Sequence, residues 1–304
     1  DGNGVVVNMG PMPAPPAAAD YNDDGYIDVV YIGDTRGHMW RIDVTPDSSA
    51  PRGLLDPGDG QLHGYVPFEL FDTCRDVSNA FQKAPPKTGK NCVQPVFYEP
   101  GIVYLGGASA PPALGIAFGT GDRSQLTRSA PSDGATPPTF EKNGFYYIID
   151  GGATSQTMGR NDLIDLTLAA NGGTNPCQPY DPTVCGLTGF VLDYETDREK
   201  TTTTVFSTLG ELSVLTYTPD SVSPCATNGN SFRYRFFYLT GQQGYLTSDY
   251  GGYRQFVTDH FASAGQSVAP NGDIIDTTLY SEGIHQDVTP ASLQTIQNNW
   301  KEQQ

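Results

Sequence analysis

The residues with the clearest chemical potential lie in a short acidic stretch near the start of the sequence. Three oxygen-bearing side chains alternate with other residues, and a glycine and a further aspartate follow them: the set is Asp20, Asn22, Asp24, Gly25 and Asp28. This set matches the first nine positions of a calcium-binding loop, D-x-N-x-D-G-x-x-D. Positions 1, 3 and 5 of such a loop turn hard oxygen ligands toward one centre, and the glycine permits the sharp turn that follows. The spacing therefore predicts a calcium site.

The same template supplies the rest of the ligand shell. Tyr26, at position 7, would offer its backbone carbonyl, and Asp28 would close the shell directly or through water. A helix-loop-helix site has a bidentate glutamate at position 12, but here that position is Tyr31. We therefore expect a loop that leads into a strand and a dissociation constant of about 10⁻⁶ to 10⁻³ M. The alternative is a solvated turn without an ion, although three carboxylates held together would repel one another.

The sequence around this loop predicts an all-β protein. Short runs of β-branched, aromatic and other apolar residues alternate with Gly, Asp, Asn or Pro. The runs cover residues 26–33, 38–44, 66–71, 93–99, 101–107, 114–121, 143–150, 188–194, 203–209, 211–218, 232–241 and 243–249. Glycine-bearing turns such as GDTRG at 33–37 predict hairpins, which fit either a sandwich or the blades of a propeller. Aromatic residues such as Trp40, Tyr146 and Phe236 are expected in the packing between strands.

Three long segments and the end of the chain complete the organisation. Residues 45–65, 121–142 and 151–187 are polar and rich in Pro, Gly, Ser and Thr, so we expect exposed loop insertions there. At the end of the chain, Thr289 can cap a short helix and Pro290 suits its first turn.

The charge of the chain limits the partners that it can bind. The formal net charge is −17, which would repel the phosphates of nucleic acids and an anionic membrane surface. No stretch approaches the roughly 20 apolar residues that a membrane helix needs. We therefore expect no nucleic-acid binding and no membrane span. Because the sequence begins at Asp1, we read it as a mature or partial chain.

The cysteines indicate an oxidising compartment. Cys74 and Cys92 lie close in sequence, as do Cys177 and Cys185, and both pairs occur in polar segments that suit disulfides. Cys225 is left over, either free or paired with a residue outside this chain. The alternative is a cytosolic protein with five reduced cysteines.

Longer blocks of the sequence resemble a known family. The acidic loop continues into DVVYIGDTRGHMWRIDV, residues 116–124 read IAFGTGDRS, and residues 223–241 contain a cysteine, a glycine-bearing turn and an aromatic strand. Together these blocks, spread over residues 18 to 250, resemble the C-terminal propeller of the PilY family. Members of that family are large proteins associated with type IV pilus tips.

The resemblance implies a fold and a site. The fold would be a modified or partial β-propeller, with about three to four blades in this chain. Residues 1–19 would be a Pro-rich lead-in, residues 20–288 the propeller region, and residues 289–304 a C-terminal helix or tail. The ligands carried over from the family are Asp20, Asn22, Asp24, the Tyr26 carbonyl and Asp28, with Ca²⁺ as the cofactor.

The resemblance also implies a non-enzymatic function. We expect an extracellular or cell-surface protein at the pilus tip that supports pilus biogenesis, surface adhesion and twitching motility. Its partners would be minor pilins or other tip proteins, and host or abiotic surfaces. One alternative is a calcium-stabilised adhesion or glycan-binding propeller unrelated to pili. Another is a quinoprotein-like enzyme, because GDTRGHMWRID resembles the strand repeat of quinone-dependent dehydrogenases.

Other catalytic or metal-binding motifs are absent from the sequence. It contains no G-x-S-x-G, H-E-x-x-H or P-loop motif. The four histidines, His38, His63, His260 and His285, are widely separated, and none stands beside a cysteine or carboxylate at metal-binding spacing. We therefore expect surface or structural roles for them.

Overall fold

The structure, a computed structural model, describes most of the elements that the sequence predicts. The described residues are 9–20, 24–44, 54–55, 62–63, 67–75, 94–105, 113–122, 142–151, 157–170, 189–196, 198–208, 210–220, 229–244, 250–259, 262–268, 274–280 and 283–289. Helix in this part of the chain is limited to α1 (Thr167–Ala170) and the 3₁₀ turns η2 (Arg160–Asp162) and η3 (Tyr250–Gly252). The predicted all-β class is confirmed.

The first sheet carries the acidic loop at its edge. Its strands, in spatial order, are β1 (Ala17–Ala19), β2 (Val29–Gly33), β3 (His38–Asp43), β6 (Phe68–Asp72) and β10 (Met158–Gly159). The hairpin predicted at 33–37 joins β2 to β3, with Gly33 opposite Met39. Gly37 has a φ of +91° in this turn, a conformation that favours glycine. Alternate β2 residues, among them Val29 and Tyr31, face the interior.

The second sheet is the middle layer of the molecule. Its order is β11 (Ile164–Asp165), β12 (Gly189–Asp193), β9 (Gly144–Asp150), β8 (Leu114–Gly119) and β7 (Gly101–Tyr104). Every residue of β8 and β12 is buried, so both faces of this sheet are covered. Continuous apolar strands of this kind are expected only where a sheet packs on both sides.

The third sheet is centred on a long hairpin. Strands β15 (Glu211–Pro219) and β16 (Gly229–Phe237) pair along their whole length. Shorter strands extend this pair: β13 (Lys200–Thr201), β14 (Phe206–Thr208), β17 (Gln242–Gln243) and β18 (Arg254–Thr258). Two separate ladders complete the described elements: β19 (Ser263–Val268), β20 (Ile274–Tyr280) and β21 (Gly283–Thr289) form one, and β4 (Leu54–Leu55) with β5 (Leu62–His63) forms the other.

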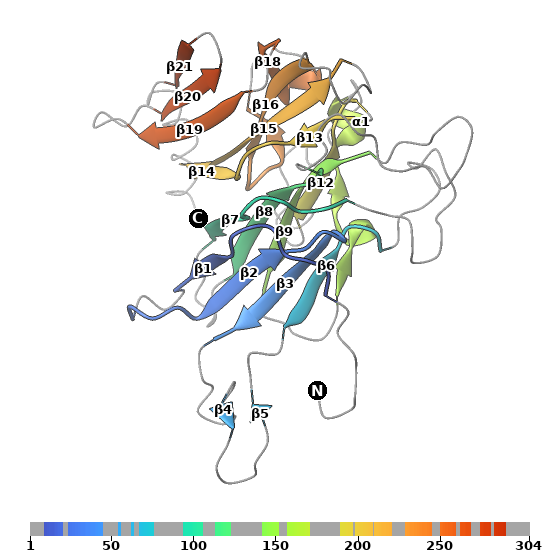
Figure 1. Cartoon of the computed structure of the whole chain (residues 1–304), viewed down its shortest axis with the longest axis vertical. Helices are drawn as coiled ribbons and strands as arrows, with labels where there is room; N and C mark the ends of the chain where they lie inside the picture. Colours follow the sequence, from blue (N-terminus) through green and yellow to red (C-terminus); the bar gives the residue numbers. More distant parts are fainter. Residues whose placement is uncertain are drawn as a thin grey trace, which may run out of the picture.

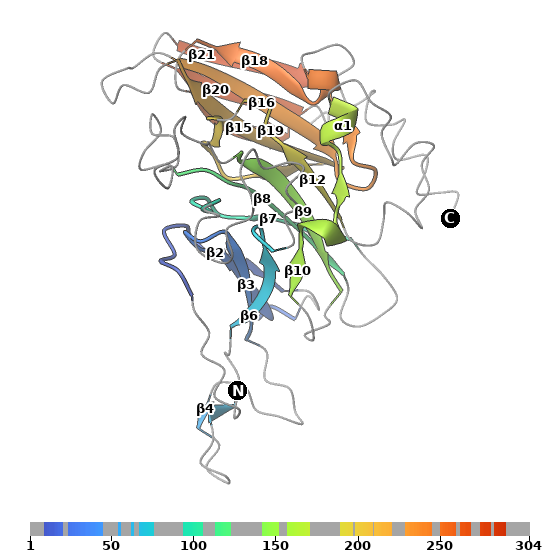
Figure 2. The same ribbon diagram turned by 90° about the vertical axis from the view of Figure 1, so that its right-hand side faces the viewer.

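Two hydrophobic cores join the three large sheets face to face. Along β9, Tyr146 and Ile148 belong to the core shared with the first sheet, whereas Phe145 and Tyr147 belong to the core shared with the third. This division follows from the period of two in a strand, which sends successive side chains to opposite faces. Figures 1 and 2 show the blue first sheet, the green second sheet and the yellow to orange third sheet in succession. The sheets are stacked as blades, which is the propeller-like arrangement expected.

Aromatic stacking occurs in both cores. Phe118 and Tyr146 stack with ring centroids 5.3 Å apart in the first core, and Phe145 and Phe236 stack at 4.3 Å in the second. Such pairs contribute about 0.5 to 1.5 kcal/mol each beyond the area that they bury. The expected packing role of Tyr146 and Phe236 is therefore confirmed.

Three interpretations from the sequence differ from the structure. Residues 94–99, expected within a strand, form none, although Val96 is buried. Residues 157–170 were expected in an exposed insertion, but they contain β10, η2, β11 and α1, and Leu166 is buried in the second core. Four strands after residue 250, β18, β19, β20 and β21, were not predicted.

Several predictions fall wholly or partly outside the described residues. These include Cys92, Cys177, Cys185, Cys225 and residues 290–304 of the predicted C-terminal helix; Thr289 itself is the last residue of β21. Cys74 is disulfide-bonded, but its pairing with Cys92 stays a prediction. Within the described part of the chain, no helix has the length and apolar character needed to cross a membrane.

Candidate calcium loop and neighbouring polar sites

The acidic loop connects the first two strands of the first sheet. Its two ends are held together by strand pairing, in which Ala19 lies opposite Val29. The Asp28 N–H donates to the Ala19 carbonyl at 2.9 Å, and the Asp28 carbonyl accepts the Val44 N–H at 2.8 Å. The hairpin therefore brings the first and last predicted ligand residues, Asp20 and Asp28, to the same end of the sheet. Figure 1 shows β1 and β2 at the edge from which this loop leaves.

Within the loop, the backbone folds around the carboxylate of Asp20. Its two oxygens accept the Asp24 N–H at 3.3 Å and the Gly25 N–H at 2.7 Å. The Asp24 carboxylate in turn accepts the Tyr26 N–H at 2.9 Å. Gly25 has a φ of +88°, which a side chain would strain. These bonds produce the sharp turn that a compact oxygen-ligand loop requires.

The described ligand residues differ in their exposure. Asp28 is only 1% exposed and is fixed at the start of β2, whereas Asp20 is half-buried and Asp24 is exposed. The side chain of Tyr26 is 77% exposed and that of Ile27 is 53% exposed. Asn22 lies outside the described residues. The ligand set as a whole thus remains a prediction.

The chemistry of the loop fits a calcium ion. Residues 20–28 contain four aspartates and one asparagine, and their sequence includes no Lys, Arg or His. Carboxylate, amide and carbonyl oxygens are the hard ligands that Ca²⁺ takes, usually six to eight of them. Asp20, Asn22, Asp24, Asp28 and the Tyr26 carbonyl would hold the ion, which would supply positive charge to an otherwise anionic turn.

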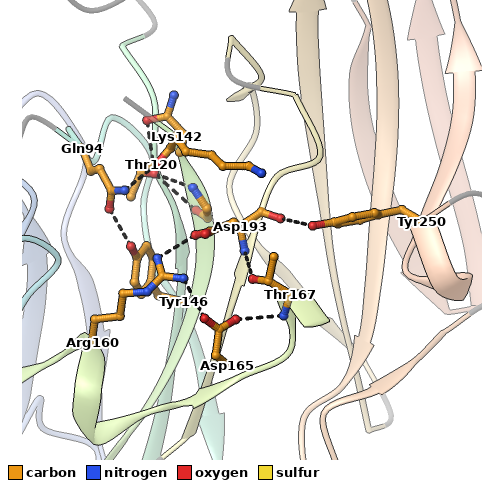
Figure 3. Close-up of polar contacts among 11 residues, drawn as sticks. Gln94, Thr120, Lys142, Tyr146, Arg160, Asp165, Thr167, Asp193 and Tyr250 are labelled. Carbon is orange, nitrogen blue, oxygen red and sulfur yellow. Dashed lines mark hydrogen bonds and ion pairs between the residues drawn. The ribbon is translucent and has the colours of Figure 1, made fainter. Parts of the chain in front are cut away.

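A buried ion pair lies at the junction of the second sheet and the segment before it (Figure 3). Arg160, in η2, donates to Asp193 of β12 at 2.6 Å and to Asp165 of β11 at 3.1 Å. Burial raises the pKa of the Asp193 carboxyl above its ordinary value, although the charge of Arg160 opposes this shift. The pair fixes the 160–165 segment against the second sheet.

Hydrogen bonds extend from this pair to neighbouring layers. The Asp193 N–H donates to the Thr167 hydroxyl at 3.1 Å, and the Tyr250 hydroxyl donates to the Asp193 carbonyl at 2.8 Å. Close by, the Tyr146 hydroxyl donates to Gln94 at 2.5 Å (Figure 3). Buried polar groups that are satisfied in this way specify one arrangement of the sheets. This network could not be predicted from local patterns, because Arg160 is far from Asp193 along the chain.

His38 also departs from the expectation for the histidines. Its Nδ1 lies 2.9 Å from Asp34 and its Nε2 lies 4.0 Å from Asp72. The expectation that His38 stands apart from carboxylates is therefore wrong. The hairpin turn folds Asp34 back onto His38, and strand pairing places Asp72 opposite it. The i, i+4 spacing of Asp34 and His38 across the GDTRG turn could have signalled the first contact.

Comparisons with known proteins bear on the fold. No protein-family model matches the chain, and no curated protein does. Among solved structures, the crystal structure of the Pseudomonas aeruginosa PilY1 C-terminal domain matches with a TM-score of 0.51. The two folds are similar. The match covers 90% of this chain and 60% of the PilY1 chain, at 16% sequence identity. This likeness supports the propeller-like description of the stacked sheets, and the chain spans 60% of that structure.

Proposed function

We propose that this chain is part of a calcium-binding, extracellular protein of type IV pili. It would act without catalysis at the pilus tip, supporting pilus biogenesis, surface adhesion and twitching motility. The observation that carries the proposal is the position of the acidic loop. A nine-residue oxygen-ligand pattern, folded around Asp20, lies at the edge of a blade in a fold similar to that of the PilY1 C-terminal domain.

Calcium would act by ordering the loop. The ion would draw the carboxylates of Asp20, Asp24 and Asp28 together and offset their mutual repulsion. Because Asp28 is buried at the start of β2, this order would be transmitted to the edge strand. Tyr26 and Ile27 belong to the same turn and are exposed, so ion occupancy would fix how these apolar side chains are displayed.

The displayed surface would contact other proteins of the pilus tip. Minor pilins are the expected partners, along with host or abiotic surfaces that the tip meets. An exposed aromatic and an aliphatic side chain beside a bound cation suit such a contact, because aromatic residues are enriched at protein interfaces. The net charge of −17 disfavours nucleic acids as partners.

The proposal is tested with the variant Asp24→Ala and a matched control. Asp220→Ala removes an exposed aspartate outside the loop, so it changes the net charge equally. Calcium at about 100 times its dissociation constant should stabilise the wild-type protein and the control by about 2.7 kcal/mol, and Asp24→Ala far less. Melting temperatures with calcium and with a chelator measure this difference.

The pilus role needs a cellular measurement. Bacteria that carry Asp24→Ala should lose twitching motility, whereas those with Asp220→Ala should keep it. Normal motility in a variant that no longer responds to calcium would contradict the regulatory role of the ion. Normal pilus assembly without the protein, together with specific hits on a glycan array, would instead favour a glycan-binding module.

A further inference from the structure

A buried carboxylate organises the turn between β2 and β3. Asp34 is 0% exposed. Its oxygens accept the backbone N–H groups of Gly10 and Arg36 at 2.8 Å and that of His38 at 3.0 Å. They also accept the Trp40 indole N–H at 3.0 Å and lie 2.9 Å from the His38 ring. Burial alone would raise the pKa of Asp34, but hydrogen bonds from His38 and Trp40 outweigh it and hold the pKa well below its usual value.

This carboxylate determines which ring nitrogen of His38 carries the lone pair that can bind a metal ion. An ionised carboxylate can only accept hydrogen bonds, so the Nδ1 of His38 must carry the proton that it shares with Asp34. In the neutral ring, Nε2 then presents a lone pair. The ring is also held edge-on to Trp40, with centroids 5.6 Å apart. Histidines that bind metals are oriented in the same way, by a carboxylate on the opposite ring nitrogen.

A β-bulge brings two further carboxylates to the same face. His38 pairs with Asp72 and Trp40 pairs with Glu69, with a shift of register between Met39 and Trp40 that leaves one extra residue in β6. Residues three apart in a regular strand point to opposite faces, but one extra residue reverses this relation. Glu69 and Asp72 therefore share the face that bears His38, whereas Met39 faces the core of the first two sheets.

The three side chains form a compact donor set. Their ligand atoms lie within 4.8 Å of one another, and all three residues are half-buried. The Asp72 carboxylate is oriented by the Cys74 N–H at 2.8 Å. Burial raises the pKa of Glu69, the neighbouring carboxylates add to this shift, and His38 opposes it. The nearby Arg75 guanidinium donates to the Thr157 carbonyl at 2.6 Å.

We propose that His38 Nε2, Glu69 and Asp72 bind a divalent transition-metal ion. One imidazole and two carboxylates match the ligands of Zn²⁺, with a fourth position left for water. The site lies at the opposite end of β2 from the acidic loop, so it is independent of the calcium proposal. The ion would tie β3 to β6 close to the disulfide-bonded Cys74.

Zinc titration of the full chain tests this site. Isothermal titration calorimetry in calcium at a concentration chosen to saturate the acidic loop should show one equivalent of Zn²⁺ bound by the wild-type protein. His38→Ala and Glu69→Gln should each weaken this affinity at least tenfold. His285→Ala removes a histidine of β21 and should leave the affinity unchanged. Equal zinc affinity in His38→Ala and His285→Ala would overturn the proposal.

A second measurement needs no variant and so does not depend on variants folding. In nitrogen-15 NMR spectra of the histidine rings, zinc should shift the Nε2 resonance of His38 and leave its Nδ1 protonated. A His38 ring unaffected by stoichiometric zinc would show that the cluster is only an ion-pair network.

Discussion

The buried pair of Arg160 and Asp193 gives the sharpest prediction about stability, through the variant Asp193→Leu. This change keeps the backbone bonds of residue 193 to Thr167 and Tyr250 but takes the closest carboxylate away from Arg160, a residue that is 8% exposed. Removing one partner of a buried pair costs about 3 to 5 kcal/mol. Asp165 still contacts Arg160 at 3.1 Å, so we expect the lower value, about 3 kcal/mol.

The opposite variant, Arg160→Met, should cost less. Burial already raises the pKa of Asp193, so without its partner this carboxyl can take up a proton and become neutral. An arginine cannot become neutral in this way, because it does not lose its proton in proteins. The asymmetry between the two variants therefore follows from their chemistry rather than from the number of bonds removed.

Urea unfolding at fixed calcium concentration measures both variants. The loss in Asp193→Leu should correspond to a fall in melting temperature of about 5 °C for a chain of this size. Equal losses in the two variants, or a larger loss in Arg160→Met, would show that the unpaired charge of Arg160 does not determine the cost. A loss below about 1 kcal/mol in Asp193→Leu would show that the pair contributes little to stability.

Three further predictions concern single positions. Burial raises the pKa of Glu199 from 4.5 to about 7. The protonated Glu199 therefore stabilises the fold below about pH 4.5, and this contribution is lost as the pH rises through about 7. Glu199→Gln should remove up to about 3 kcal/mol of the pH dependence of the free energy of unfolding, measured by urea unfolding at about pH 5 and pH 8. Gly189→Ala should destabilise the protein by more than about 2 kcal/mol, because φ is +106° and the added Cβ would lie 2.0 Å from the Tyr147 carbonyl oxygen. In the control Gly151→Ala, the added Cβ meets nothing within 4 Å, so this variant should keep the wild-type stability in the same assay. Phe236→Ala should cost about 3 to 5 kcal/mol through loss of packing in the second core while leaving the calcium-induced rise in melting temperature intact; an abolished calcium response would contradict the separation of core and loop.

Local patterns in the sequence account for much of the architecture. Short runs of apolar residues bounded by turn residues predict the strands β2, β3, β8, β9, β12, β15 and β16. The turn chemistry of GDTRG likewise predicts the hairpin around Gly37, whose positive φ requires glycine. The spacing of Asp20 and Asp24 predicts the acidic loop, and the side chains of both residues accept hydrogen bonds from its backbone.

Contacts that depend on pairing between distant strands could not be predicted from the sequence. The segment around Arg160 reads as a polar loop, but its contact with Asp193 and the burial of Leu166 make it part of the interior. The face of Glu69 depends on a bulge in β6, which shifts the strand register without any proline or glycine to mark it. Such features arise from the packing of whole layers, which local propensity does not encode.

The proposed function depends on calcium binding by the loop at the edge of the first sheet. Isothermal titration of the calcium-stripped chain, with Asp24→Ala as the comparison, tests it most directly. We expect one loop-dependent equivalent of calcium to bind with a dissociation constant of about 10⁻⁶ to 10⁻³ M, and this binding to be lost in the variant. No heat of binding and no rise in melting temperature up to millimolar calcium would contradict it.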